Sequence, residues 1–379
     1  MIPVTERIER FLKNEHPPSP FIVIDLDLVR ASYRQLRELL PAAAIYYAVK
    51  ANPAPAVVAA LAELGAGFDL ASAGEIERCR KVGVPFARCS FGNTIKKEQD
   101  IALAAGDGID LFAFDSAAEL EKLGRLAPGA RVFCRLAVEN AGSQWPLTRK
   151  FGCSREMAID LLLRARAQGL RPAGISFHVG SQQTDPRAWA FAIADAAGVF
   201  RVCAKAGVEL ELLNLGGGLP AQYRTPVPLL SAYAEAIESA LAAEFGNARP
   251  HLLIEPGRYL VGDAGLLRST VLLIAVKSRY ARRRWVYLDA GRYNGLPETL
   301  GERIQYRLRT PRDGGPDAAA ALAGPSCDST DILYQHSDYH LPLELAIGDP
   351  IDFLSAGAYT ASYASVEFNG FAPIQTYCI

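Results

Sequence analysis

Short apolar segments alternate with helical segments from residue 45 to residue 258 of this 379-residue chain. Each apolar segment is a continuous hydrophobic run, as expected for parallel strands that are buried on both faces. Helical segments, such as 54–64, 73–82 and 186–206, fall between these runs. The predicted strands are 45–50, 67–72, 89–93, 111–116, 132–138, 174–180, 210–216 and 252–258.

This rhythm restricts the fold more than any other feature of the chain. About eight strand–helix units in roughly 220 residues predict an α/β fold of the (β/α)8 or TIM-barrel type. A doubly wound open sheet is the competing architecture, and a G-x-G-x-x-G turn would favour it. The sequence contains no such turn, so we expect the closed barrel.

The pattern changes after about residue 265, where strands separated by turns replace the strand–helix units. We therefore expect a (β/α)8 barrel over 27–264 and a β-rich domain, either a barrel or a sandwich, over 265–379. Residues 1–26 form a helix and a strand that we expect to pack with the C-terminal β domain. The predicted C-terminal strands are 267–276, 284–289, 343–346, 350–355 and 372–377, with a Pro-, Gly- and Ala-rich loop over 309–326.

Composition excludes several classes of protein. The chain is 50% hydrophobic with a formal net charge of -1, and it has no long block of like charge that would indicate a nucleic-acid partner. No apolar run approaches the roughly 20 residues that a membrane helix needs. The seven cysteines are scattered without metal-ligand spacing, which argues against zinc and favours a reducing compartment. The expected location is the cytoplasm.

Lys50 ends the first predicted barrel strand, in the segment IYYAVKANP. An ammonium group at the end of a buried strand tends to pair, to shift its pKa or to react. A desolvated amine with a lowered pKa is what Schiff-base chemistry requires. The alternative is a lysine whose side chain merely extends to solvent.

The other predicted strands also deliver polar residues to their C-terminal ends, which form the functional face of such a barrel. A set of this kind at one end is difficult to explain by packing alone. Its members are Lys50, Asp69, Asn93, Arg135, His178, Ser181, the glycines Gly216, Gly217 and Gly218, Glu255 and Arg258.

Three of these features point to one cofactor when they are combined with an amine nucleophile. The three glycines, with Arg258 after the next strand, are suited to hold a phosphate. A carboxylate such as Glu255 keeps a pyridine nitrogen protonated, and His178 could stack on a ring or act in acid–base chemistry. Together they specify pyridoxal 5'-phosphate.

Each residue also has a purely structural interpretation. The glycines could form an ordinary tight turn, and Glu255 could form a salt bridge with Arg258. His178 could be a satisfied core residue. Asp69 is the expected partner of Lys50, which could be a structural ion pair alone.

The motifs closely resemble those of the ornithine decarboxylase group of fold-type III pyridoxal-phosphate enzymes, most of all its short bacterial members. This group is related to diaminopimelate and arginine decarboxylases and to alanine racemase. The resemblance runs from about residue 20 to the C-terminus. The segments that carry it are YAVKAN, FDLAS-AGEIE, FGNTIKK, RKFGC, FHVGSQ, NLGGGLP, EPGR, GPSCDSTDIL and GAYTASYASVEFNGF.

The resemblance implies an alanine racemase-like fold and a pyridoxal-phosphate-dependent decarboxylation of a basic L-amino acid. The implied reaction is ornithine to putrescine, in polyamine biosynthesis. Lys50 would carry the cofactor, with Asp69, Glu75 and Arg135 as its polar surroundings. His178 would stack on the ring and Glu255 would bind its nitrogen. The implied phosphate-binding residues are Ser181, Gly217, Gly218, Arg258 and Tyr359.

The resemblance also implies a homodimer with two composite active sites. Cys327 would govern protonation of the reacting carbon, and Asp328 would meet the distal amine of the substrate. Both would reach into the site of the partner subunit, with Tyr293 nearby. Independently of the resemblance, Cys327 could be a small buried hydrophobic residue.

One position departs from the family pattern. Short bacterial ornithine decarboxylases tend to have an acidic residue where this chain has Gly301, and that acid helps to recognise the terminal ammonium of the substrate. Glu302 is adjacent and is the candidate replacement. Lysine or another diamino acid is therefore an alternative substrate.

Two further alternatives concern the activity itself. A racemase of this fold would tend to pair an arginine with the ring nitrogen, and Glu255 at that position argues against it. A non-catalytic homologue that binds decarboxylase subunits would be expected to lose the cofactor lysine or Cys327, and this chain has both.

Overall fold

The computed structural model describes residues 4–145 and 150–379, so Arg149 of the RKFGC segment lies outside the described residues. The chain divides into two compact units. The barrel unit comprises residues 30–220 and 227–260. The β unit comprises the residues up to 29, together with 221–226 and 261–379.

The barrel unit contains a closed barrel of parallel strands, as predicted. Pairing of β11 with β2 closes the ring. In order around the ring the strands are β2 (Ala43–Ala48), β3 (Gly67–Leu70), β4 (Cys89–Phe91), β5 (Leu111–Phe114), β6 (Arg131–Arg135), β8 (Arg171–Ser176), β10 (Leu212–Asn214) and β11 (His251–Ile254). Each lies within, or overlaps, one of the eight predicted apolar segments.

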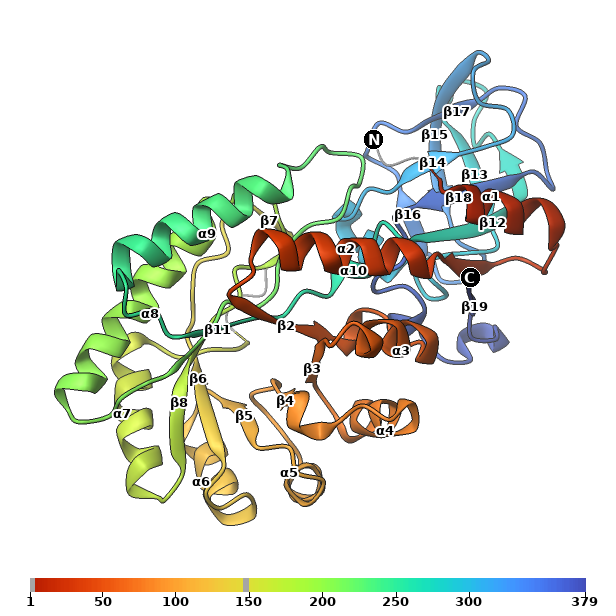
Figure 1. Ribbon diagram of the computed structural model, residues 1–379. Helices are drawn as coiled ribbons and strands as arrows, with labels where there is room; N and C mark the ends of the chain where they lie inside the picture. The colour runs from red at the N-terminus through yellow and green to blue at the C-terminus, as the bar shows by residue number, and fades with distance from the viewer. Residues whose placement is uncertain (1–3, 146–149) are drawn as a thin grey trace. The chain divides into compact units, whose positions relative to one another are not determined.

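Helices follow the barrel strands along the chain and lie around the outside of the ring (Figure 1). Serine side chains cap three of them: Ser72, Ser116 and Ser154 accept hydrogen bonds from backbone N–H groups in the first turns of α4, α6 and α7. The helices are α3 (Pro55–Glu63), α4 (Ala73–Val82), α5 (Glu98–Gly106), α6 (Ala117–Leu126), α7 (Arg155–Ala167), α8 (Arg187–Lys205) and α9 (Leu230–Phe245). Two further helices are α2 (Leu26–Leu39) and α10 (Arg258–Val261).

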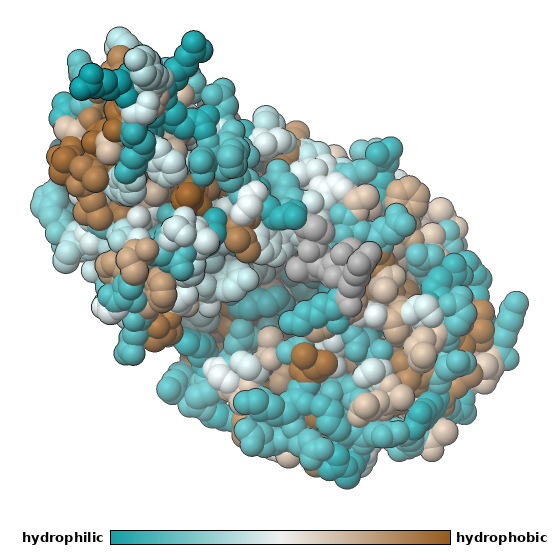
Figure 2. Space-filling view, turned by 180° about the vertical axis from the view of Figure 1, so that it is seen from behind, coloured by the Kyte–Doolittle hydropathy of each residue, from teal (hydrophilic) through white to brown (hydrophobic). Residues whose placement is uncertain are grey.

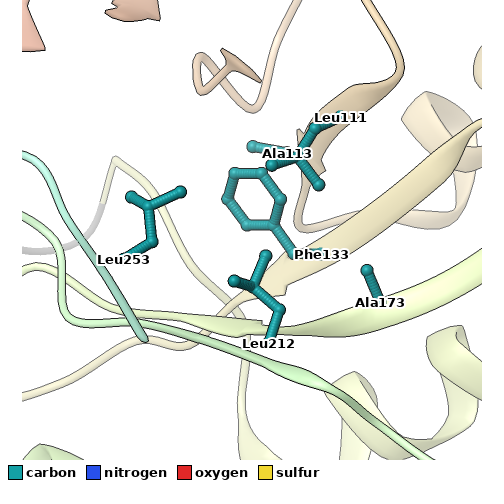
Figure 3. Close-up of a cluster of buried hydrophobic side chains, with 6 residues drawn as sticks. All are labelled: Leu111, Ala113, Phe133, Ala173, Leu212 and Leu253. Carbon is teal, nitrogen blue, oxygen red and sulfur yellow. The ribbon is translucent and has the colours of Figure 1, made fainter. Parts of the chain in front are cut away.

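Apolar side chains fill one layer of the barrel interior. They project from β5, β6, β8, β10 and β11 toward one another, with the ring of Phe133 among them (Figure 3). Tyr46 from β2 packs against the same cluster. The buried members are Leu111, Ala113, Phe133, Ala173, Leu212 and Leu253.

The position of this apolar layer also determines which side chains form the next layer of the barrel interior. Side chains two positions apart lie on the same face of a strand. Arg135 follows Phe133, Asn214 follows Leu212 and Glu255 follows Leu253 by two residues. Polar groups are therefore set above the apolar layer, at the C-terminal end of the barrel.

The β unit is built on a sheet of mostly antiparallel strands, in the order β14-β18-β12-β13-β15-β16. Strand β1 pairs antiparallel with β12 and parallel with β19. The strands are β1 (Phe21–Ile24), β12 (Gly265–Ala275), β13 (Arg284–Leu288), β14 (Arg307–Arg309), β15 (Asp317–Ala323), β16 (Ile332–Tyr334), β17 (His340–Pro342), β18 (Pro350–Leu354) and β19 (Gln375–Cys378).

The N-terminal helix α1 (Glu6–Asn14) belongs to the β unit, and Thr5 caps it. Its buried residues Ile8 and Leu12 pack in one cluster with Phe21 and Val23 of β1 and with Leu266 of β12. The N-terminal segment is thus part of the hydrophobic core of the β unit.

The predicted loop over 309–326 was wrong. Its second half is strand β15, which pairs with β13 and β16 and is buried from Ala320 to Ala323. Alanine is depleted in strands in general, but small side chains suit a strand that is buried between neighbours. The predicted strand 343–346 is also displaced, because pairing ends at Pro342 of β17.

Hydrophilic residues cover most of the face shown in Figure 2, and hydrophobic ones gather in separate patches. Large hydrophobic side chains of the β unit that are exposed include Leu272, Leu273, Val276 and Ile347. Across 4–145 and 150–379, no helix has both the length and the apolar character needed to cross a membrane.

A glycine in β3 makes room for the tyrosine ring inside the barrel. A Cβ atom on Gly67 would lie 2.6 Å from two ring carbons of Tyr46. We therefore expect Gly67→Ala to lower the free energy of unfolding by about 1–3 kcal/mol through overpacking. Urea denaturation of the variant and the wild-type protein measures this difference.

Gly106→Ala is the matched control. A Cβ at this position, at the end of α5, would have no heavy atom within 4 Å. Alanine is also favoured over glycine in a helix by up to about 1 kcal/mol, so this variant should be as stable as the wild type or slightly more stable. Equal stability of the two variants would contradict the packing assigned to Gly67.

Candidate active site at the C-terminal end of the barrel

The predicted cofactor residues of the barrel unit lie on, or just after, the C-terminal ends of its strands. Lys50 lies in a short 3-10 turn (Val49–Ala51) directly after β2, and Asp69 lies in β3. Arg135 is the last residue of β6. His178 follows β8, Gly216–Gly218 follow β10, and Glu255 follows β11.

Lys50 and Asp69 form the expected ion pair. Nζ of Lys50 lies 3.1 Å from Oδ2 of Asp69. The carboxylate side chain is only 3% exposed, whereas the lysine side chain is 46% exposed. The amine is therefore held by a buried anion without being desolvated itself, which differs from the burial expected for it. The buried Oδ1 atom of Asp69 has no hydrogen-bond partner among the described residues.

A glycine directly after the neighbouring strand β4 provides the space for Asp69. A Cβ atom on Gly92 would lie 2.0 Å from Oδ1 of Asp69. Any larger residue at this position would displace the carboxylate, and with it the anchor of Lys50.

Glu255 is held by an asparagine of the adjacent strand. Nδ2 of Asn214 donates to Oε1 of Glu255 at 2.5 Å, and Oδ1 of Asn214 accepts from the backbone N–H of Gly216 at 2.9 Å. A backbone N–H can only donate, so the amide orientation is fixed. One carboxylate oxygen is therefore committed to Asn214, and a proton on Glu255 would reside on the other.

Burial, together with the nearby charge of Asp69, raises the pKa of Glu255 to about 7. The charges of Lys50 and Arg135 and the hydrogen bond from Asn214 act in the opposite direction. A carboxyl group with this pKa can hold or release a proton near neutral pH. That property suits a group that pairs with a pyridine nitrogen.

His178 is neutral in this environment. Burial holds its pKa well below the ordinary value, and the charges of Arg135 and Lys50 lower it further. Its Nδ1 atom accepts a hydrogen bond from the backbone N–H of Gly180 at 3.0 Å. The ring proton is consequently on Nε2, and a neutral, fixed imidazole is well suited to stack on an aromatic ring.

The glycine-rich turn lies against Gly180, the neighbour of Ser181, and Ser181 contacts Arg258. Gly216 and Gly218 have φ of 63° and 125°, which favour glycine, and a Cβ on Gly216 would lie 1.9 Å from the backbone oxygen of Phe177. A Cβ on Gly217 would lie 2.7 Å from the backbone oxygen of Glu255. The guanidinium of the buried Arg258 donates to Oγ of Ser181 at 2.9 Å.

Glu75 and Arg135 lie in the same polar region. Ser72 caps α4 by accepting from the backbone N–H of Glu75, and Oε2 of Glu75 accepts from the backbone N–H of Ala71, the residue before the cap, at 2.7 Å. Burial raises the pKa of Glu75. The guanidinium of Arg135 lies 5.1 Å from the ring centroid of Phe151.

These residues fit pyridoxal phosphate. The backbone of the glycine turn, with Arg258 and Ser181, forms a cradle that a Cβ would fill and that matches a phosphate. Glu255, His178 and Lys50 supply the ring-nitrogen partner, the stacking group and the amine.

Comparison with known proteins decides the family. Residues 26–262 match the model of the pyridoxal-dependent decarboxylase family, in its pyridoxal-binding domain. The lysine/ornithine decarboxylase of Selenomonas ruminantium is 37% identical over 355 residues, which cover 93% of this chain and 88% of that protein. Mouse (Mus musculus) ornithine decarboxylase is 32% identical over 377 residues, covering 95% of this chain and 80% of that protein.

The fold is shared as well. The structure of SrLDC in complex with PLP and cadaverine superimposes with a TM-score of 0.88 at 34% identity, and the match covers 100% of this chain and 94% of that one. The chain belongs to the pyridoxal-dependent decarboxylase family. It is a pyridoxal-phosphate-dependent decarboxylase of basic amino acids.

In this decarboxylase three predicted residues of the β unit, Tyr293, Cys327 and Asp328, belong to one cluster. The hydroxyl oxygens of Tyr293 and Thr330 lie 2.8 Å apart. Oδ1 of Asp328 accepts from both the hydroxyl and the N–H of Thr330 at 2.7 Å. These hydrogen bonds from Thr330 hold the pKa of Asp328 below its ordinary value. Cys327 is exposed next to Asp328.

Two other predicted residues of the β unit have distinct settings. Tyr359 has a left-handed backbone, with φ of 55°. The Glu302 carboxylate accepts from the backbone N–H groups of residues 335, 336 and 337 at 2.6–2.7 Å, and from the hydroxyl of Ser337. Although burial acts to raise the pKa of Glu302, these hydrogen bonds hold it below the ordinary value. This carboxylate orders a turn of the β unit, which gives no support to a substrate-binding role for it.

Two relevant side chains could not be identified from the sequence. Asn214 precedes the glycine turn and is 0% exposed, but an amide inside a strand has no distinctive sequence signal. Lys96 is fully buried and donates to the carbonyl oxygens of Asn93 and Ala113 at 2.8 and 2.6 Å. Burial lowers its pKa to about 8, despite an ion pair with Glu119 at 3.0 Å.

The raised pKa of Glu255 predicts a pH dependence of stability. A carboxyl group with a raised pKa stabilises the folded protein below its unfolded-state pKa, and this contribution is lost as pH rises through about 7. The cofactor-free wild type should therefore lose stability relative to Glu255→Gln between about pH 4.5 and 7. Urea denaturation of both proteins at pH 5 and pH 7.5 measures the difference, and parallel pH profiles would contradict this assignment.

Proposed function

We propose that the preferred substrate is L-ornithine and that the product is putrescine, as in polyamine biosynthesis. The decarboxylase chemistry is supported by the polar layer at the C-terminal end of the barrel. In this layer Lys50 is paired with Asp69, and Glu255 is hydrogen-bonded to Asn214. Ornithine is supported by the names of the two relatives, one a lysine/ornithine and one an ornithine decarboxylase. Asp328 supplies the anionic group for the distal ammonium.

The bound pyridoxal phosphate supplies an electron sink for the bond that breaks when carbon dioxide leaves. The protein groups have separate tasks around it. Lys50 would hold the cofactor through its side-chain amine, which Asp69 anchors. Glu255 keeps a proton at the ring nitrogen, through the oxygen that Asn214 leaves uncommitted. Cys327 delivers the final proton to the reacting carbon.

We further propose that the active unit is a homodimer with composite sites. Residues 27–264 bind the cofactor, and 265–379 contribute Cys327, Asp328 and Tyr293 to the site of the partner subunit. In this proposal residues 1–26 complete the β domain, and Tyr359 contributes to phosphate binding. The scattered cysteines support a cytoplasmic location.

A panel of amino acids tests the substrate. Carbon dioxide release by the holoenzyme is measured with ornithine, lysine, arginine and diaminopimelate. We expect kcat/KM for ornithine to exceed that for lysine by about 10- to 200-fold, which is the discrimination that one methylene allows. Equal or better turnover of lysine would contradict the preference for ornithine and would agree with the alternative substrate suggested by Gly301. Loss of optical activity without carbon dioxide release would indicate racemisation.

Two matched variants locate the group that recognises the distal ammonium. Asp328→Asn removes a charge and should raise KM by about tenfold or more, because hydrogen bonds to charged groups contribute about 1.5–3 kcal/mol. Glu302→Gln should leave KM unchanged and lower stability by about 1–3 kcal/mol, since its carboxylate serves backbone donors. If KM rises in Glu302→Gln and not in Asp328→Asn, Glu302 is the residue that binds the distal ammonium.

A further inference from the structure

One side-chain amide of the β unit contacts both the backbone and the sulfur of Cys327. The backbone N–H of Cys327 donates to Oδ1 of Asn369 at 3.1 Å, and Nδ2 of Asn369 donates to Sγ of Cys327 at 3.4 Å. Because a backbone N–H can only donate, the amide oxygen must face it. The amide N–H is therefore directed at the sulfur.

The backbone around Asn369 is held in an unusual conformation. Asn369 itself has φ of 52° and ψ of 20°, and its neighbours Glu367 and Gly370 have φ of 59° and 75°. Asparagine is one of the few residues besides glycine that adopt this left-handed region readily. Such conformations persist where the surroundings fix them, and they cluster at functional sites.

The segment that carries Asn369 is attached to the rest of the Cys327 cluster through an aromatic contact. The rings of Phe368 and Tyr293 lie 4.7 Å apart between centroids. The backbone N–H of Ser365 also donates to the carbonyl oxygen of Tyr293 at 2.8 Å. Asn369 thus reaches Cys327 from a segment that is fixed on both sides of residue 367.

The turn that carries Cys327 is fixed independently by a buried carboxylate. Asp331 is 3% exposed and accepts from the N–H of Arg292 at 2.8 Å and the N–H of Ser326 at 3.1 Å. A Cβ on Gly291 or Gly324 would lie within 2.5 Å of this carboxylate, so both glycines leave it room. The contact between Asn369 and Cys327 therefore joins two ordered segments.

We propose that Asn369 is a positioning residue that aims the Cys327 thiol and stabilises its thiolate. The proposal rests on the proposed function, in which Cys327 protonates the reacting carbon. In that step the S–H bond breaks and a C–H bond forms at the carbon that has lost carbon dioxide. The electron pair of that carbon takes the proton, and the S–H bonding pair stays on sulfur. The thiolate then recovers a proton from solvent, and an N–H aimed at sulfur favours the charged form.

Two substitutions separate the parts of this contact. Asn369→Asp keeps an oxygen for the N–H of Cys327 and tolerates the left-handed backbone, but it replaces the donor to sulfur with a negatively charged oxygen. Asn369→Gly keeps the backbone conformation and removes the side chain. A purely structural role predicts that the aspartate variant is close to wild type, whereas thiolate stabilisation predicts that it is the worse of the two.

The readout is the alkylation rate of Cys327 by iodoacetamide in the holoenzyme without substrate, followed by mass spectrometry of its peptide. Thiolates are the reactive species, so the rate at pH 7.5 should fall several-fold in Asn369→Gly and about tenfold or more in Asn369→Asp. In steady-state kinetics both variants should lower kcat and leave KM for the substrate unchanged. Val366→Ala, an exposed change in the same segment, should keep the wild-type alkylation rate.

Equal alkylation rates in the wild type and the two Asn369 variants overturn the proposal. A fall in the alkylation rate that is seen in Asn369→Gly but not in Asn369→Asp also overturns it. The aspartate keeps the hydrogen bond to the backbone N–H of Cys327 and lacks the donor to sulfur, so that result would indicate a purely structural role. If the ordered loss of reactivity is found in an enzyme that decarboxylates none of the amino acids tested, the role of Asn369 at the thiol stands and the proposed function fails.

Discussion

The two-residue repeat of side chains along the barrel strands is the constraint on which the active site depends. An apolar layer built around Phe133 closes the interior of the ring. Strand geometry then requires the next inward-facing residues to stand directly above it. Those residues are Arg135, Asn214 and Glu255. The hydrophobic layer beneath them leaves no room for their side chains deeper in the barrel. Packing therefore determines where the chemical groups stand.

Mutual contacts between neighbouring strands then determine the state of each group. Asp69 of β3 holds Lys50 after β2, and Asn214 of β10 holds Glu255 after β11. The negative charge of Asp69 also contributes to the raised pKa of Glu255. Burial is the larger cause, and the carboxylate that pairs with Lys50 adds to it in raising the pKa of Glu255. The cofactor site is one electrostatic system rather than a set of independent residues.

The sequence was sufficient for the barrel and for most of the residues at its functional end, because continuous apolar strands and polar strand ends are local signals. It was insufficient where a contact joins distant segments. The role of Glu302 depends on backbone donors at residues 335–337, about 33–35 positions away. Strand β15 was missed because its alanines have no strand signal apart from their neighbours in the sheet. Asn214 was missed because its role depends on the contact with Glu255, which lies 41 positions away in the sequence.

Two lysines of this chain have settings that could suit a covalent cofactor. Lys96 is buried with a pKa of about 8, but its ammonium is engaged by two carbonyl oxygens and Glu119. Lys50 is accessible and stands on a buried carboxylate at the functional end of the barrel. Reduction of the holoenzyme with borohydride, followed by peptide mapping with mass spectrometry, identifies the lysine directly. This account predicts a pyridoxyl group on the peptide that contains Lys50, whereas modification of Lys96, or of neither lysine, would contradict it.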